Sequence, residues 1–253
     1  MNVKSGVILF VIFVGIISLA CSNVNDQIES RSMSNLEQQT EPSDVAIREM
    51  FIESGLADGD SLLEDLMKID RERVVAIVRE VKDNGIREGD TTFGAPNADK
   101  VLRLKAAYFL FWLGVEADEN EKYVVDVATA NDAFLRNEAL GWVAAMVGDG
   151  RKQHLPLLFA ATAKADTHLA EGLTYFYLDE LQASPDSFLR QLSKQSTTIR
   201  FAVYRFISKS ITAEESEEFE AIRKKVAVFL ENPELKAPAA EFLKNCNTPK
   251  ASP

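Results

Sequence analysis

Five short segments of this chain place a small residue at one position and bulky residues one helical turn further on. The small residues are Ala106, Ala139, Gly172, Ala202 and Ala239, at steps of 33, 33, 30 and 37 residues. A small residue lets a neighbouring helix approach closely, and a bulky residue one turn later fills the space beyond it. Repeats of this length, each holding two helices, predict stacked helix pairs that form an α-solenoid.

The bulky positions lie three and four residues after each small one. They hold Phe109 and Leu110, Trp142 and Val143, Tyr175 and Phe176, Arg205 and Phe206, and Phe242 and Leu243. Apolar residues also recur with helical spacing from residue 43 onward, and no clear alternating strand pattern is present. We therefore predict an all-α fold, a right-handed α-solenoid of five to six antiparallel helix pairs over residues 43–246, followed by a disordered tail over residues 247–253.

Several helix ends are marked by capping residues. Ser43 and Asp70 are suited to begin helices, and Asn84 with Gly85 is suited to end one. The aspartates expected to cap the repeated helices are Asp99, Asp132 and Asp166.

Two of the segments resemble the HEAT-like repeat family, in which an aspartate precedes an apolar–arginine pair and small residues. The matching residues are Asp99, Leu102, Arg103, Ala106, Ala107 and Gly114 in the first segment, and Asp132, Leu135, Arg136, Ala139 and Gly148 in the second. The resemblance covers roughly residues 70–245 and implies a protein-binding scaffold, as in most members, although some repeat proteins are lyases or enzyme activators. The matching positions are packing positions, so no functional residue transfers with them.

Residues 1–20 have the layout of a secretory signal. A cationic start with Lys4 is followed by an apolar run of 14 residues and a small residue before Cys21. This resembles a bacterial lipoprotein signal, which implies that Cys21 is acylated and becomes the first mature residue. The alternative is an uncleaved signal anchor, although a membrane-spanning helix needs about 20 apolar residues. Residues 21–42 are polar, and we expect a lipidated cysteine followed by a disordered tether.

These features predict a location in the bacterial cell envelope. We expect a protein that is anchored to the membrane by a lipid on Cys21, at the outer membrane and facing the periplasm. The formal net charge is −11, and it becomes −12 when residues 1–20 and their single cation, Lys4, are removed. Such an acidic chain repels phosphate backbones, so nucleic acid is not an expected partner. With Cys21 lipidated, Cys246 has no cysteine to pair with and is expected to be buried and inert.

No catalytic signature is present in the sequence, and no cofactor is expected. His154 and His168 are the only histidines, and with Asp166 and Glu171 they form at best a weak candidate for a divalent metal. Their spacing lacks a recognised ligand pattern, so solvated or capping histidines are the favoured interpretation.

Partner contacts are predicted at exposed aromatic residues and in the longest loop. Tyr175, Phe176 and Tyr177 are consecutive and cannot all point inward from one helix. The loop over residues 85–97 is either functional or a plain insertion. The predicted partner-binding residues are Trp112, Tyr175, Tyr177, Phe93 and Arg87.

The sequence therefore favours a non-enzymatic, envelope-anchored scaffold that binds an unidentified protein along the concave face of a helical-repeat domain. Two alternatives remain open. One is an enzyme or enzyme-activating lipoprotein with a weak metal site near His154 and His168. The other is a carrier that holds a small ligand in the aromatic-rich interior.

Overall fold

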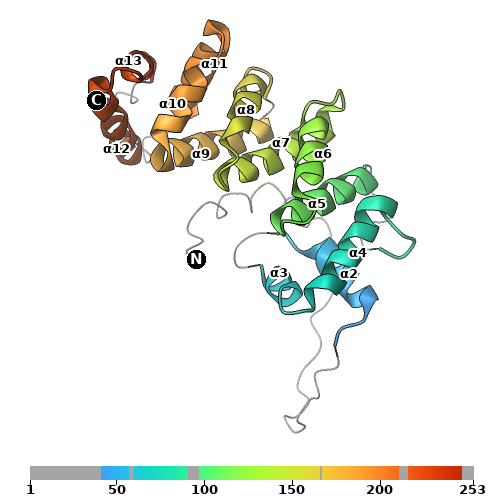
Figure 1. Cartoon of the computed structure of the whole chain (residues 1–253). Coiled ribbons are helices and arrows are strands. Elements are labelled where there is room, and N and C mark those ends of the chain that lie inside the picture. The colour runs from blue at the N-terminus through green and yellow to red at the C-terminus, as the bar shows by residue number, and fades with distance from the viewer. Residues whose placement is uncertain (1–40, 57–59, 91–96, 166, 211–215, 247–253) are drawn as a thin grey trace, which may run out of the picture. The chain divides into compact units, whose positions relative to one another are not determined.

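A computed structural model describes residues 41–56, 60–90, 97–165, 167–210 and 216–246 (Figure 1). Within these ranges the regular structure consists of twelve α-helices and two short 3-10 helices, with no strand. The prediction of an all-α fold is confirmed.

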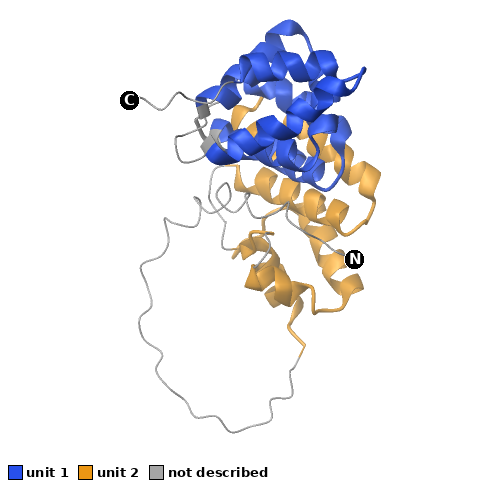
Figure 2. Cartoon of the chain, turned by 90° about the vertical axis from the view of Figure 1, so that its left-hand side faces the viewer, with its two compact units in different colours: residues 1–10, 140–253 blue, residues 11–139 orange. Residues whose placement is uncertain are grey.

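The chain divides into two compact units, which Figure 2 distinguishes by colour. Unit 2 ends at Ala139, and unit 1 contains the described residues from Leu140 onward. Unit 2 holds α2 (Asp44–Glu53), α3 (Ser61–Leu66), α4 (Arg71–Asn84), α5 (Ala98–Trp112) and α6 (Ala117–Ala128). The boundary falls within α7 (Ala133–Gly148).

Unit 1 continues with six α-helices and two short 3-10 helices among its described residues. They are η1 (Lys152–His154), α8 (Leu155–Thr162), α9 (Thr167–Ala183), α10 (Pro185–Ser193), α11 (Thr197–Ser210), α12 (Ser216–Ala227), η2 (Val228–Glu231) and α13 (Lys236–Asn245). Its main contacts join helices that are one to three apart in the chain, such as α8 with α9, α10 and α11.

Short polar side chains begin several helices as expected. The Ser43 hydroxyl accepts a hydrogen bond from the Ala46 amide, and the Asp70 carboxylate accepts one from Arg73. Asp132 accepts hydrogen bonds from the amides of Phe134 and Leu135, which confirms its predicted capping role. These bonds satisfy amides that have no partner inside the helix.

The prediction for Asp99 is wrong, and Asp166 lies outside the described residues. Asp99 lies in the first turn of α5, and the residue before that helix is Asn97, whose φ of 59° is left-handed. The Asp99 carboxylate instead accepts hydrogen bonds from the Ile86 amide at 2.9 Å and from Arg103 Nε at 2.8 Å. Although burial opposes it, these two bonds hold the pKa of Asp99 below its ordinary range.

Residues 85–90 are fastened to the helices of unit 2 by buried charges. Arg48 of α2 donates to both carboxylate oxygens of Asp90, at 3.1 and 2.8 Å, and to the Gly85 carbonyl at 2.6 Å. The same guanidinium lies 2.7 Å from Glu80 of α4. Gly85 has a φ of 71°, and a Cβ there would lie 1.7 Å from Asp99, so this position requires glycine.

A second buried cation joins α5 to the end of α2. Lys105 is only 7% exposed, and its ammonium donates to the carbonyls of Phe51, Ile52 and Ser54, at 2.6, 3.0 and 2.5 Å. The carbonyls at a helix C-terminus lack partners within the helix and carry partial negative charge, so they suit an ammonium. The helix-to-helix contact in unit 2 thus contains polar connections as well as apolar packing.

The repeat predicts burial well in some helices and poorly in others. Ala106, Ala139 and Ala239 are fully buried, as their assigned packing role requires. Gly172 of α9 and Ala202 of α11 are only partly buried. The pattern therefore weakens within unit 1, at α9 and α11.

Candidate functional site

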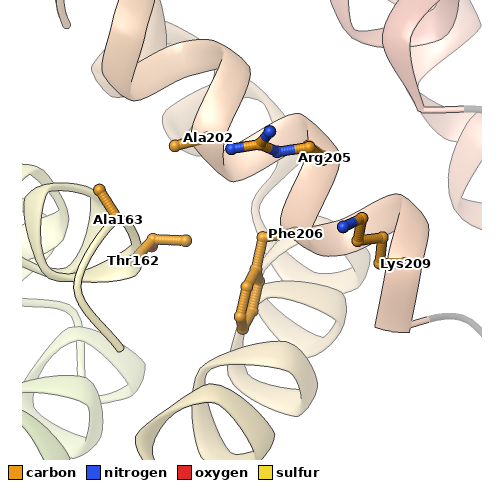
Figure 3. Close-up of a pocket in the computed structure, with 6 residues that line it drawn as sticks. All are labelled: Thr162, Ala163, Ala202, Arg205, Phe206 and Lys209. Atoms are coloured by element: carbon orange, nitrogen blue, oxygen red, sulfur yellow. The ribbon is translucent and has the colours of Figure 1, made fainter. Parts of the chain in front are cut away.

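The candidate site is a groove in unit 1 between the end of α8 and one face of α11 (Figure 3). Its volume is about 350 Å³, which lies in the range of small-molecule and side-chain pockets. The lining residues are Thr162 and Ala163 on one side and Ala202, Arg205, Phe206 and Lys209 on the other.

The groove opens where the repeated packing pattern departs from its first two copies. Ala202 and Phe206 occupy the small and bulky positions of the fourth segment, and both are partly exposed. Their counterparts in the first segment, Ala106 and Leu110, are fully buried. Arg205 stands where the other segments carry an aromatic residue, and its side chain is exposed.

Phe206, which lines the groove, belongs to an aromatic cluster around Tyr177 of α9. The Tyr177 ring lies 5.7 Å from Phe159, 5.6 Å from Phe188 and 6.2 Å from Phe206, measured between ring centroids. These rings come from α8, α9, α10 and α11, so four helices meet at Tyr177. The edge-on geometry of the Tyr177–Phe206 pair is a favourable arrangement for aromatic rings, and it fixes Phe206 at the groove.

A buried hydrogen bond fixes the opposite wall. The hydroxyl oxygens of Tyr177 and Thr162 are 2.7 Å apart. Thr162 donates its proton to the Leu158 carbonyl at 3.1 Å, so the Tyr177 hydroxyl is the donor to Thr162. Burial raises the pKa of the Tyr177 phenol, so it keeps this proton.

Two cations border the groove, and no carboxylate of the described residues neutralises them. Arg205 and Lys209 are exposed, and within the described part of the chain neither has an ion-pair partner. Arg200, one turn earlier on the same helix, does pair with Glu241 at 3.0 Å. Figure 3 shows the nitrogens of Arg205 and Lys209 on the side of α11 that borders the groove. The C-terminal end of α8 favours nearby cations but does not occupy their hydrogen-bond donors.

The groove is built for binding. Arg205 and Lys209 supply hydrogen-bond donors for an anion, while Phe206 and the two alanines supply apolar surface. The Thr162 hydroxyl is already engaged in two hydrogen bonds, so it is not poised as a nucleophile.

The three aromatic residues predicted as partner contacts have different surroundings. Tyr177 is fully buried, so its assignment as a partner contact is wrong. Tyr175 is partly buried, and Trp112 is 45% exposed and stacked on Phe109 at 5.8 Å. Contact of Tyr175 or Trp112 with a partner stays a prediction.

The predicted loop residues are described in part. Arg87 is exposed and lies 2.7 Å from Glu80, and its amide donates to Asp90 at 2.7 Å. Phe93 and Cys21 lie outside the described residues. The start of the loop is therefore a fixed stem, and the partner role of Arg87 stays a prediction.

The suggested metal site and the second cysteine can each be located. His154 ends η1, but the side chain of His168 lies outside what the structure describes. Among the described residues, no three His, Cys, Asp or Glu side chains lie close enough together to hold a metal ion. Cys246 is buried, its thiol lies 3.5 Å from the Tyr204 carbonyl, and burial raises its pKa to about 12.

Arg205 and Lys209 were absent from the predicted site residues. The signal that reveals Arg205 is the repeat itself, because the third residue after the small one is Phe109, Trp142, Tyr175 and Phe242 in the other segments. A cation at that position indicates that the side chain cannot be buried between the helices as an aromatic ring is. Lys209 follows Arg205 by about one helical turn.

Comparison with known protein families, with curated proteins and with solved structures finds no match for this chain. Across the described ranges, no helix combines the length and the apolar character needed to span a membrane.

Proposed function

We propose that this chain is a lipid-anchored, HEAT-like helical-repeat protein that binds another protein through the groove between α8 and α11 and catalyses no reaction. The observation that carries the proposal is the pair of exposed cations, Arg205 and Lys209, beside the partly covered ring of Phe206. Cations next to apolar surface are typical of binding sites, where charge selects the partner and apolar contact adds affinity.

The solenoid part of the proposal is supported by the order of helix contacts. In unit 1, α8 contacts α10, α9 contacts α11, α10 contacts α12, and α11 contacts α13. Contacts between every second α-helix are expected for stacked helix pairs, in which each pair contacts its neighbours. The buried small residues Ala106, Ala139 and Ala239 fit the same interpretation.

The envelope location is proposed from the sequence of residues 1–42. Replacing Cys21 with Ser removes the acylation site, so we expect the parent protein to incorporate a labelled fatty acid in cells and the Cys21→Ser protein to incorporate none. A parent protein without the label, or a Cys21→Ser protein that still carries it, would contradict lipid anchoring at Cys21.

Binding is tested by placing a photo-crosslinking benzophenone side chain in the groove at Ala163. The matched control carries the same side chain at Lys224, which is exposed on α12 in the same unit. We expect one discrete crosslinked protein from Ala163 in the native envelope, lost when Arg205 is replaced by Glu. No crosslink, or the same products from both positions, would refute binding at this groove. A co-purified small molecule without a protein crosslink would favour the carrier alternative.

A further inference from the structure

We propose that the groove between α8 and α11 recognises a short acidic segment of its partner, in which two carboxylate side chains two residues apart follow an apolar side chain. This inference rests on the proposed function and specifies the chemistry of the partner. It is carried by the charge, the spacing and the apolar content of the groove.

The charge of the site is opposite to that of the molecule. The chain has 39 acidic and 28 basic side chains, so a cation usually has acidic neighbours. In unit 1, Lys152 lies 2.6 Å from Glu180 and Arg190 lies 2.5 Å from Glu234. Arg205 and Lys209 have no such partner among the described residues, although α11 itself holds the paired Arg200. Carboxylates are the natural ligands for this guanidinium and ammonium.

The spacing of the two cations fits an extended peptide. Arg205 and Lys209 are four residues apart on α11, which separates them by about 6 Å along the helix axis. Side chains two residues apart in an extended chain lie on one face and are separated by roughly 6.6 Å. A carboxylate–x–carboxylate segment can therefore reach both cations at once.

Apolar surface lies beside the two cations in the groove. Ala202 and Phe206 are partly exposed there, and Phe201 is 46% exposed one turn before Arg205. Because Tyr177 holds the Phe206 ring, this surface is already ordered before a ligand arrives. An apolar side chain of the partner can cover it while the carboxylates reach the cations.

The length of the groove favours a peptide segment. From Ala202 to Lys209 α11 rises about 10 Å, which matches about three residues of extended chain. A long polyanion such as nucleic acid would extend beyond the two cations and meet the net negative charge of the protein. A short acidic segment places its charge only at the groove.

The test is fluorescence anisotropy with the full chain in detergent and a fluorescein-labelled peptide, Gly-Phe-Ala-Asp-Ala-Asp-Gly, in which the Phe and both Asp side chains lie on one face of the extended chain. One comparison peptide carries Asn in place of both Asp residues, and a second carries Ser in place of Phe. We expect the acidic peptide to bind and the Asn peptide to bind at least tenfold more weakly. The Ser peptide is expected to bind at least about fivefold more weakly than the peptide with Phe, since it loses the apolar contact. Binding of the acidic peptide should also weaken as salt is raised.

Protein variants separate the groove from general attraction between charges. The double variant Arg205→Gln and Lys209→Gln should lose at least tenfold in affinity. Lys224→Gln, an exposed cation on α12, should remain within twofold of the parent. Because all three side chains are exposed, these changes are expected to preserve the fold, and circular dichroism verifies this.

The outcomes distinguish this inference from the proposed function. Equal binding of the acidic and Asn peptides, or unchanged affinity in the double variant, would overturn the acidic-segment inference. If the Ala163 crosslink to a protein persists in that case, the groove still binds a partner of different chemistry. If the crosslink and the peptide both fail, the proposed function fails as well.

Discussion

The buried ammonium of Lys105 makes the stability of unit 2 depend on pH in an unusual direction. Burial lowers the pKa of Lys105 to about 7, whereas the charges of Asp60 and Glu53 act to raise it. An unfolded chain leaves this lysine near its ordinary pKa of about 10.4. Between these two values the unfolded chain binds more protons than the folded chain, so stability increases with pH.

The magnitude follows from the two pKa values. Between pH 7 and pH 9 the unfolded chain keeps the Lys105 proton, while the folded chain releases most of it. The free energy of unfolding of unit 2 should therefore rise by about 2 kcal/mol over this interval. The gain is absent below pH 7, where both states carry the proton.

Trp112 provides a local assay for this effect. It stacks on Phe109, whose ring lies 5.5 Å from Phe51, the residue beneath the Lys105 ammonium. In a Trp142→Phe background, Trp112 is the remaining tryptophan and its fluorescence follows unit 2. Urea unfolding at pH 7, 8 and 9 then gives the free energy of unfolding at each pH.

Two variants isolate the contribution of Lys105. In Lys105→Met the rise of about 2 kcal/mol should disappear, because no group titrates at this position. The control is Lys68→Met, which removes an exposed lysine from the same unit and should keep the rise. If the parent and Lys105→Met change equally between pH 7 and pH 9, the three carbonyls keep the ammonium protonated and the reasoning is refuted.

Three further predictions concern other buried polar groups. Replacing Thr162 with Val leaves the buried Tyr177 hydroxyl without an acceptor and should lower the free energy of unfolding by about 1–3 kcal/mol, measured with urea. Tyr177→Phe removes the donor as well and should cost less, about 1 kcal/mol. The reverse order would contradict the assigned donor. Cys246 should react with a thiol reagent at pH 8 at least a hundredfold faster in guanidinium than in the folded state, because burial raises its pKa to about 12; equal rates would show that it is accessible. Arg48→Met leaves the buried carboxylate of Asp90 without its cation and should cost about 3–5 kcal/mol by urea unfolding; a loss below about 1 kcal/mol would exclude a structural role for this pair.

The sequence predicted the helical class because its main signals are local. Apolar spacing and capping side chains act within one or two turns, so the helices after Ser43 and Asp70 begin where expected. The prediction for Asp99 was wrong because its role depends on a hydrogen bond between residues far apart in the sequence. Its carboxylate binds the Ile86 amide 13 residues earlier, and no helix-start signal describes a bond of that kind.

The buried side of α9 shows the same limit. The run Tyr175, Phe176 and Tyr177 established that these three side chains diverge, but not which of them points inward. The structure selects Tyr177 because Phe159 and Phe188, which come from other helices, both pack against its ring. A helical pattern states which residues share a face, whereas the neighbouring helices decide how deeply that face is buried.

The exposed guanidinium of the groove follows from one change in the repeat, in which Arg205 replaces an aromatic residue. Burying a large apolar side chain at the position of Arg205 would contribute about 2–3 kcal/mol, as an aromatic residue does in other segments. A guanidinium without a buried carboxylate cannot enter the same space, because its desolvation costs more than its packing contributes. Arg205 therefore stays exposed, and Ala202 and Phe206 beside it stay partly uncovered. The exposed cation and the partly exposed apolar surface therefore lie side by side in the same groove.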